Sequence, residues 1–291
     1  MTPVDLRLEF TAPLFPDNLF GHLAATAGPG VEEWRDGAYR CALRLAGGPA
    51  IAALAPRFDH VAARVWLTDP ADVVAARERC RFLLDLDTDP ARVDAVLAAD
   101  PVLAPLVAAA PGRRVPRFFD ADQFAVRAVL GQQVSTAAAR THAGRLVAAY
   151  GEPLADPDGG LTHLFPTPEQ LVGLEPEELA MPRTRRETLL GLLAALRSGD
   201  VDLTAPDGLE ALAKLRGIGP WTVQSVAMRA LGDGDAFLPT DLGVLKAAAA
   251  LGLPEKPRDL VTHAETWRPY RAYAVQHLWA TGEHPVNTLP I

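Results

Sequence analysis

Residues 208–252 read GLEALAKLRGIGPWTVQSVAMRALGDGDAFLPTDLGVLKAAAALG, and this stretch indicates how the chain folds. Leucine, valine and alanine recur at helical spacing on both sides of Gly217. Between these runs, the GIGP segment at 217–220 favours a tight turn, because glycine adopts conformations that other residues avoid and proline suits the first turn of a helix. The stretch predicts two helices joined by a hairpin, then a loop that delivers Asp241 to a third helix.

The predicted hairpin offers a site for an anion. The second helix begins there, so its free N–H groups and the positive end of its dipole point outward. A phosphate of a nucleic-acid backbone would fit such a site without any reading of base sequence. The alternative is an ordinary glycine turn between two packed helices, and the glycines alone do not separate the two interpretations.

The order of these features resembles the helix–hairpin–helix (HhH-GPD) superfamily of DNA glycosylases. LRGIGPWT at 215–222 is similar to their hairpin, and PTD at 239–241 is similar to the segment that carries their catalytic aspartate. Members that also cut the DNA strand have a lysine at the place of Trp221, and tryptophan cannot form the Schiff base that this lysine forms. The form with tryptophan resembles the AlkA-type DNA-3-methyladenine glycosylase II family, which implies a hydrolase of the N-glycosidic bond without AP-lyase activity.

The resemblance implies a role in base excision repair. The chain is expected to be a monofunctional DNA glycosylase that flips alkylated bases out of double-stranded DNA and removes them, chiefly 3-methyladenine and other N-alkyl purines. It implies no cofactor, and a monomer is expected. Two alternatives stay open: a non-catalytic module that binds damaged DNA, and a glycosylase of the same fold for oxidised or deaminated bases.

Asp241 is the expected catalytic residue. A carboxylate near C1′ of a flipped nucleotide would stabilise the positive sugar that forms as the base leaves, much as in glycoside hydrolysis. Aspartate directly before the LGVLKAAAALG run is also a good helix N-cap. The two roles are compatible, since one residue can serve both.

Three further residues are expected to form the base pocket. In the family, the positions of Trp221 and Trp279 are pocket tryptophans, whose electron-rich faces attract a positively charged alkylated purine. Trp279 also fits a plain core position on an amphipathic helix. His22 lies where the family can place an aromatic residue of the pocket, although a lone histidine is more often structural. Aromatic residues of the family are replaced here by Ser225 and Leu242, which suggests a roomier pocket.

The DNA contacts are expected at two loops. Gln133, in LGQQVS, occupies the place of the family's wedge residue, which enters the gap left by the flipped base; a solvent-facing glutamine is the alternative. Gly217, Gly219 and Thr222 are expected to contact the DNA backbone. The resemblance implies no catalytic metal, but the carbonyls of Gly217 and Gly219 match a place where the family can hold a monovalent cation.

The chain is expected to have an α+β, mainly α fold with two parts. Residues 1–90 predict a small antiparallel-sheet domain, TBP-like in the family, and residues 91–291 predict an all-helical glycosylase region, whose two lobes would enclose the active-site cleft. Alternating residues predict the strands Val4–Phe10, Tyr39–Leu45, Val61–Leu67 and, more weakly, Ala50–Leu54, with helices at Asn18–Ala27 and Pro70–Leu86.

The second part predicts helices with short breaks. The expected segments are Asp122–Tyr150 with a break near Gly131, Pro168–Leu174, Pro176–Leu179, Arg185–Arg197 and Pro269–Thr281, with an irregular loop at 151–166. Two arginine groups, at 113, 114 and 117 and at 183, 185 and 186, are candidates for a basic face on a chain whose net charge of −8 otherwise argues weakly against nucleic-acid binding.

Composition excludes several classes of protein. Cys41 and Cys80 are the only cysteines, too few for an iron–sulfur cluster held by four thiolates. No apolar run is long enough to cross a membrane, and the N-terminus does not read as a signal peptide. A cytoplasmic, nucleoid-associated protein is therefore expected.

Overall fold

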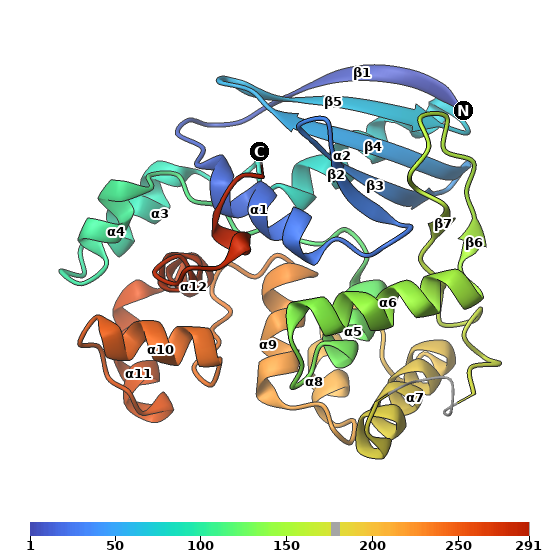
Figure 1. The fold of residues 1–291 in the computed structure, drawn as a ribbon. Helices are drawn as coiled ribbons and strands as arrows, with labels where there is room; N and C mark the ends of the chain where they lie inside the picture. The colour runs from blue at the N-terminus through green and yellow to red at the C-terminus, as the bar shows by residue number, and fades with distance from the viewer. Residues whose placement is uncertain (176–180, 291) are drawn as a thin grey trace.

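The computed structural model describes residues 1–175 and 181–290. A small antiparallel sheet comes first in the chain and helices follow it (Figure 1), which confirms the predicted α+β, mainly α fold. The helix predicted at Pro176–Leu179 lies outside the described residues.

The sheet contains five antiparallel strands in the order β1-β5-β4-β3-β2. The strands are β1 (Thr2–Glu9), β2 (Glu32–Arg35), β3 (Ala38–Leu45), β4 (Gly48–Pro56) and β5 (His60–Leu67). The four predicted strands are confirmed. The sequence missed β2, because EEWR has no apolar alternation; this short strand forms by pairing with β3, where Glu32 lies opposite Cys41.

Two helices, α1 (Pro16–Thr26) and α2 (Val73–Leu83), cover one face of the sheet, and α2 follows a short 3₁₀ turn, η1 (Pro70–Asp72). Side chains alternate across a strand, so Ala50, Ala52 and Leu54 of β4 join the core with these helices, while Ile51 points to the other face. Their apolar faces explain why both predicted helices form here.

The other face of the sheet is covered by the loop at 151–166, which is not wholly irregular as predicted. It contains a small hairpin of β6 (Glu152–Pro153) and β7 (His163–Leu164), and Leu154 and Leu161 pack on Ile51. Buried Arg40 of β3 ties this loop down, because its Nη2 donates to Asp156 Oδ1 at 2.7 Å.

The remaining chain is helical. Its elements are α3 (Pro90–Leu97), α4 (Ala104–Ala109), α5 (Ala121–Leu130), α6 (Thr136–Tyr150), α7 (Arg183–Ser198), α8 (Gly208–Ala213), α9 (Pro220–Arg229), α10 (Leu242–Ala250), α11 (Pro257–His263), η3 (Ala264–Trp267), α12 (Arg271–Trp279) and η4 (Pro285–Asn287). The break near Gly131 is confirmed. The helix predicted at Pro168–Leu174 is wrong: Thr167 and Gln170 form the reciprocal cap of a helix start, but only turns follow before Gly173.

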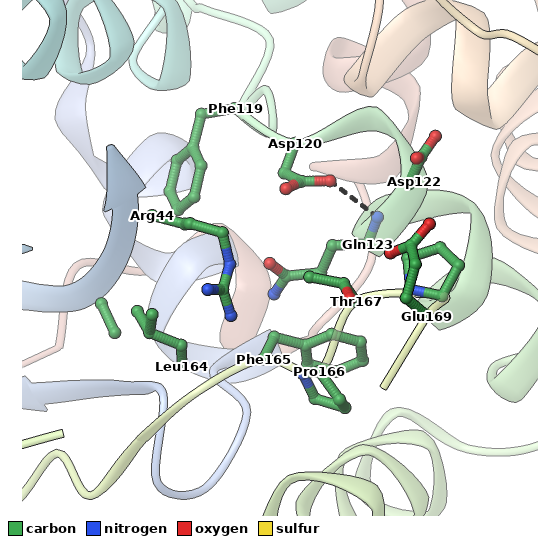
Figure 2. A pocket seen from close by; sticks show the side chains of 12 residues that line it. Arg44, Phe119, Asp120, Asp122, Gln123, Leu164, Phe165, Pro166, Thr167 and Glu169 are labelled. Atoms are coloured by element: carbon green, nitrogen blue, oxygen red, sulfur yellow. Dashed lines mark hydrogen bonds between the residues drawn. The ribbon is translucent and has the colours of Figure 1, made fainter. Parts of the chain in front are cut away.

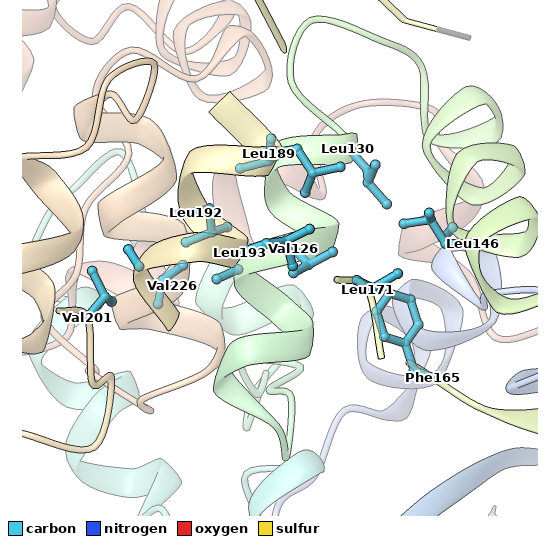
Figure 3. Packing of buried hydrophobic residues seen from close by; sticks show 14 of the residues in the cluster. Val126, Leu130, Leu146, Phe165, Leu171, Leu189, Leu192, Leu193, Val201 and Val226 are labelled. Carbon is cyan, nitrogen blue, oxygen red and sulfur yellow. The ribbon is translucent and has the colours of Figure 1, made fainter. Parts of the chain in front are cut away.

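These helices form two apolar cores. One contains side chains of α5 to α9, among them Val126, Leu193 and Val226 (Figure 3). The other joins α3 and α4 to α10, α11 and α12 around Trp267, which is completely buried. Helix α9 belongs to both, since Val226 faces the first core and Ala227 the second. The hairpin at the start of α9 therefore lies where the two cores meet.

The basic face predicted around Arg113 and Arg114 is wrong. These side chains are 7% and 0% exposed, and Arg114 donates hydrogen bonds to the carbonyls of Thr88 and Thr11. They were mistaken for surface residues because charge alone does not reveal that backbone carbonyls can take the place of water around a buried guanidinium. In the second arginine group, Arg185 is also buried.

The last described residues pack against α1, near the sheet. Element η4 lies against α1, and a Cβ added at Gly21 would come within 2.4 Å of the carbonyl oxygen of Thr288. Only a glycine lets this segment approach α1 so closely. Within residues 1–175 and 181–290, no helix is long and apolar enough to span a bilayer.

Candidate active site

Asp241 occupies the N-cap of α10, and both of its carboxylate oxygens accept hydrogen bonds. Its Oδ1 accepts from the backbone N–H of Val244 at 3.0 Å and from Trp279 Nε1 at 2.8 Å. Its Oδ2 accepts from Trp221 Nε1 at 3.0 Å. The cap role weighed from the sequence is therefore present, and the same carboxylate is held by the two tryptophans predicted beside it.

Three elements position this group. Trp221 lies in the first turn of α9, directly after the hairpin, and Trp279 is the last residue of α12. The third element is α10, where Gly243 faces Trp279: a Cβ added there would come within 2.9 Å of the indole Cδ1. A larger residue would displace the indole, so the glycine permits the approach of α12 to Asp241.

These residues open onto a cavity of about 380 Å³. Trp221, Trp279 and Asp241 form part of its wall, and His22, Ser225, Phe118, Phe124, Arg127 and Arg229 are among the others. Ser225 is 4% exposed and its hydroxyl has no partner among the described residues. Leu242, by contrast, is 74% exposed and is not part of the wall. Of the two departures from the family, Ser225 alone affects the cavity.

His22 of α1 lies against Trp279, with ring centroids 6.4 Å apart and an interplanar angle of 26°. Its Nε2 is 2.6 Å from Arg229 Nη1. Burial and the positive charge of Arg229 lower the pKa of His22 well below its ordinary value. Burial also lowers the pKa of Arg229, to about 9, which leaves the guanidinium charged at neutral pH.

The sequence missed the arginines and phenylalanines of this wall. The Arg229 guanidinium lies over the Phe124 ring at 5.3 Å, and Arg127 lies over Phe118 at 5.0 Å while it pairs with Glu32. One signal was available in α9, where Thr222, Ser225 and Arg229 recur at helical spacing on an otherwise apolar helix. A buried polar stripe of this kind often marks a functional surface.

The two hairpin glycines differ in what surrounds them. Gly217 has φ +84°, and a Cβ added there would come within 1.9 Å of Thr188 Oγ1 of α7. Gly219 has φ −99° and open space around its missing side chain. Gly217 is thus required by the protein's own packing, whereas nothing inside the described structure requires a glycine at 219.

The Thr222 side chain does not reach the surface. It is 2% exposed, and its hydroxyl accepts a hydrogen bond from Gln132 Nε2 at 3.1 Å. The contact of Thr222 with a DNA backbone stays a prediction, and it would have to use the backbone of Thr222 rather than its side chain. The same Gln132 amide donates to the carbonyl of Gly217 at 3.2 Å. Together these bonds tie the α5–α6 loop to the hairpin. The carbonyl of Gly219 accepts from Val223 within α9, and the cation site at Gly217 and Gly219 stays a prediction.

Gln133 projects from this loop. It is exposed, it has φ +55°, and no hydrogen bond involves its side chain in the described structure. Positive φ is costly for a residue other than glycine, so its neighbours must hold the backbone in this shape. Ser135, which caps α6, and the tied Gln132 flank it.

A smaller cavity, of about 150 Å³, lies between β3 and the start of α5 (Figure 2). Arg44, Phe119, Asp120 and Asp122 are among its lining residues, and Asp120 caps α5 by accepting from the N–H of Gln123. This cavity shares no residue with the one beside Asp241. Asp120 and Asp122 belong to the start of α5, and no tryptophan N–H donates to a carboxylate in this cavity as the structure describes it.

Metal ligands are not gathered anywhere in the described part of the chain, where no group of three or more His, Cys, Asp or Glu side chains comes together. Cys41 and Cys80 are both buried and unpaired. Burial raises the pKa of the Cys80 thiol to about 12, as expected for a core cysteine.

Comparison with known proteins gives a consistent result. A family profile described as the AlkA N-terminal domain matches residues 5–120. The Escherichia coli protein named DNA-3-methyladenine glycosylase 2 is 32% identical over 272 residues, which cover 90% of this chain and 92% of that protein. The Mycobacterium tuberculosis protein named probable bifunctional transcriptional activator/DNA repair enzyme AlkA is 53% identical over 99% of this chain but only 59% of its own length. This chain thus spans about three fifths of that relative.

Among solved structures, a 3-methyladenine DNA-glycosylase from Archaeoglobus fulgidus superimposes with a TM-score of 0.77 at 19% identity, covering 95% of this chain and 97% of that one. The architecture is therefore that of the helix–hairpin–helix glycosylase fold. Within this class, the chain belongs to the AlkA family, that of the E. coli DNA-3-methyladenine glycosylase 2.

Proposed function

We propose that this chain is a monofunctional DNA glycosylase that hydrolyses the N-glycosidic bond of alkylated bases, chiefly 3-methyladenine and other N-alkyl purines. The observation that carries the proposal is the double anchoring of Asp241. Each carboxylate oxygen accepts an indole N–H from a different tryptophan, at 2.8 and 3.0 Å, at the edge of a cavity of about 380 Å³.

The arrangement suits the reaction. When the bond between the sugar C1′ and the base nitrogen breaks, its electron pair leaves with the base and the sugar becomes positive. A carboxylate held by fixed donors needs no reorganisation to stabilise that charge, and it can take a proton from the attacking water. The faces of Trp221 and Trp279 attract an alkylated purine that is already positive.

The proposal excludes strand cleavage by a Schiff base. Such cleavage needs an amine nucleophile, and no lysine lies on the wall of the large cavity as far as the structure describes it. Trp221 occupies the hairpin position and uses its indole N–H on Asp241. The expected product is an uncut abasic site.

The hairpin and the α5–α6 loop would contact the DNA. The open space at Gly219 lets a phosphate approach the first N–H groups of α9. Gln133, exposed on the loop that Gln132 ties to this hairpin, would enter the gap left by the extruded base.

The test is base release from methylated duplex DNA by the wild-type protein and by Asp241→Asn. Asparagine is an equally good N-cap, so the fold should persist, while the charge is lost and one tryptophan N–H faces an amide N–H instead of an acceptor. We expect the wild type to free 3-methyladenine and the variant to be slower by at least about a hundredfold. DNA binding by both proteins without any base release would instead favour a non-catalytic module.

A further inference from the structure

The hydrogen bond between His22 and Arg229 fixes where the histidine carries its proton. A guanidinium only donates, so His22 Nε2, 2.6 Å from Arg229 Nη1, must be the acceptor. A neutral imidazole with an accepting Nε2 has its hydrogen on Nδ1. The low pKa of His22 agrees with this neutral form.

Nδ1 is free to act on the cavity. It has no hydrogen-bond partner within the described residues, and His22 is part of the cavity wall. Its ring stacks on Trp279, the residue that also anchors Asp241. The histidine therefore offers an N–H donor beside the aromatic face and the catalytic carboxylate, where a phenylalanine ring would offer only its face.

Arg229 gives this side of the cavity a positive field. It is 8% exposed, and no carboxylate lies within ion-pair distance of it in the described structure. The wall has two further guanidinium groups: Arg127 pairs with Glu32 at 2.8 Å, and Arg140 donates to the carbonyl of Ala27 at 2.7 Å. The positive charge of Arg229 favours a neutral base, which gains electron density as it leaves, whereas a cationic base is attracted by the faces of Trp221 and Trp279.

We propose that His22 donates a hydrogen bond through Nδ1 to the leaving base, and that this bond assists the release of neutral lesion bases more than the release of cationic ones. The inference rests on the proposed glycosylase function and goes beyond it. Breaking C1′–N9 of a neutral purine sends the electron pair to N9, and the ring nitrogens and any exocyclic oxygen share the negative charge. A donor at the base edge stabilises that charge; the water oxygen bonds to C1′, its proton passes to Asp241, and the base takes a proton from solvent.

Two variants of His22 test the Nδ1–H donor separately from the other contacts of the side chain. His22→Gln keeps an acceptor for Arg229 and an N–H for the cavity, whereas His22→Met has a similar length and a weak acceptor but no donor. Single-turnover release would be measured from duplexes with hypoxanthine, a neutral base, and with 7-methylguanine, a cationic one. Thermal melting would establish that each variant is folded, and His22→Phe, which keeps the ring, replaces His22→Met if that variant does not fold.

We expect His22→Met to lose about tenfold or more in hypoxanthine release while 7-methylguanine release changes by less than about threefold, and His22→Gln to retain most of both. Equal losses on both lesions, unchanged hypoxanthine release, or a wild type that frees no hypoxanthine would each overturn the inference. A wild type that frees no base of either kind would overturn the proposed function itself, which is a distinguishable result.

Discussion

Asp241 combines an observed structural role with the catalytic role proposed for it. Its Oδ1 caps α10 through the N–H of Val244, and the same oxygen accepts the Trp279 indole N–H. A helix N-terminus favours a negative charge, so the cap does not compete with the proposed role in catalysis. The two interpretations offered by the sequence are therefore both compatible with the site.

The indole N–H groups can be tested separately from the aromatic faces. Trp221→Phe and Trp279→Phe each keep an aromatic ring and remove one donor to Asp241, at Oδ2 and Oδ1 respectively. We expect each change to lower the rate of base release about tenfold, the equivalent of about 1.4 kcal/mol for one hydrogen bond to a charged group. Single-turnover kinetics on methylated DNA measures this, with Trp34→Phe, in β2, as the control.

If these donors matter only for folding, both variants would lose thermal stability in proportion to activity. A fall in the rate with an unchanged melting temperature supports a role in orienting the carboxylate. Unchanged rates in both variants would contradict the anchoring argument on which the proposed function rests.

Among the single elements, the hairpin has one glycine that packing requires, Gly217, and one that is proposed to leave room for DNA, Gly219. Gly217→Ala should destabilise the fold by at least about 1–2 kcal/mol, because it places a side chain at positive φ and against Thr188. Gly219→Ala should leave the melting temperature unchanged, since its side chain enters open space, yet weaken DNA binding by crowding the phosphate. Melting curves and titration of a fluorescent duplex at fixed salt check the two expectations; equal affinity of Gly219→Ala and the wild type would contradict the phosphate site.

In the α5–α6 loop, a substitution of Gln133 should likewise affect stability and base release differently. Its φ of +55° means that Gln133→Gly should be neutral or stabilise the protein by up to about 1 kcal/mol. Base release should nevertheless slow, because glycine cannot fill the gap left by the flipped base. Fluorescence of 2-aminopurine beside the lesion reports extrusion directly, with Gln132→Ala as a variant that also loosens the loop. A Gln133→Gly protein that flips the base normally would show that another residue is the wedge.

For the whole molecule, what matters is where the sheet meets the later helices, because residues far apart in the sequence come together there. Asp122 lies at one such place, the cavity between β3 and α5 (Figure 2). Burial and the negative charges of Asp120 and Glu169 raise its pKa from 3.8 to about 6. Between about pH 4 and pH 6 the folded protein therefore holds a proton that the unfolded chain has released. The stability gained from this proton is complete below about pH 4 and is lost as the pH rises through about 6.

Asp122→Asn removes this dependence. We expect the variant to match the wild type near pH 4 and to be more stable at pH 7 by about 1 kcal/mol, a value reduced from the full shift because the group is partly solvated. That corresponds to a rise in Tm of about 2–4 °C. Melting curves across this pH range check it, and an equal effect of the substitution at both ends would show that folding does not raise the pKa of Asp122.

Much of the secondary structure could be predicted from local signals in the sequence, although the cap at Thr167 and Gln170 did not lead to a helix. Alternation predicted β1, β3, β4 and β5, and the glycines of the hairpin together with Pro220 predicted the break between α8 and α9. The motif around Asp241 also led to the family. In each case the cause lies within a few residues, because side-chain periodicity and backbone preference act over one or two turns.

Features that depend on long-range contacts could be seen only in the tertiary structure. It formed β2 by pairing with β3, brought residues 151–166 onto the sheet, and buried Arg113 and Arg114, which the sequence presents as surface charges. It also joined His22 to Arg229 across more than two hundred residues, and so fixed the tautomer of a side chain in the cavity wall. No local pattern records such contacts, since burial and hydrogen-bond partners depend on which distant segments meet.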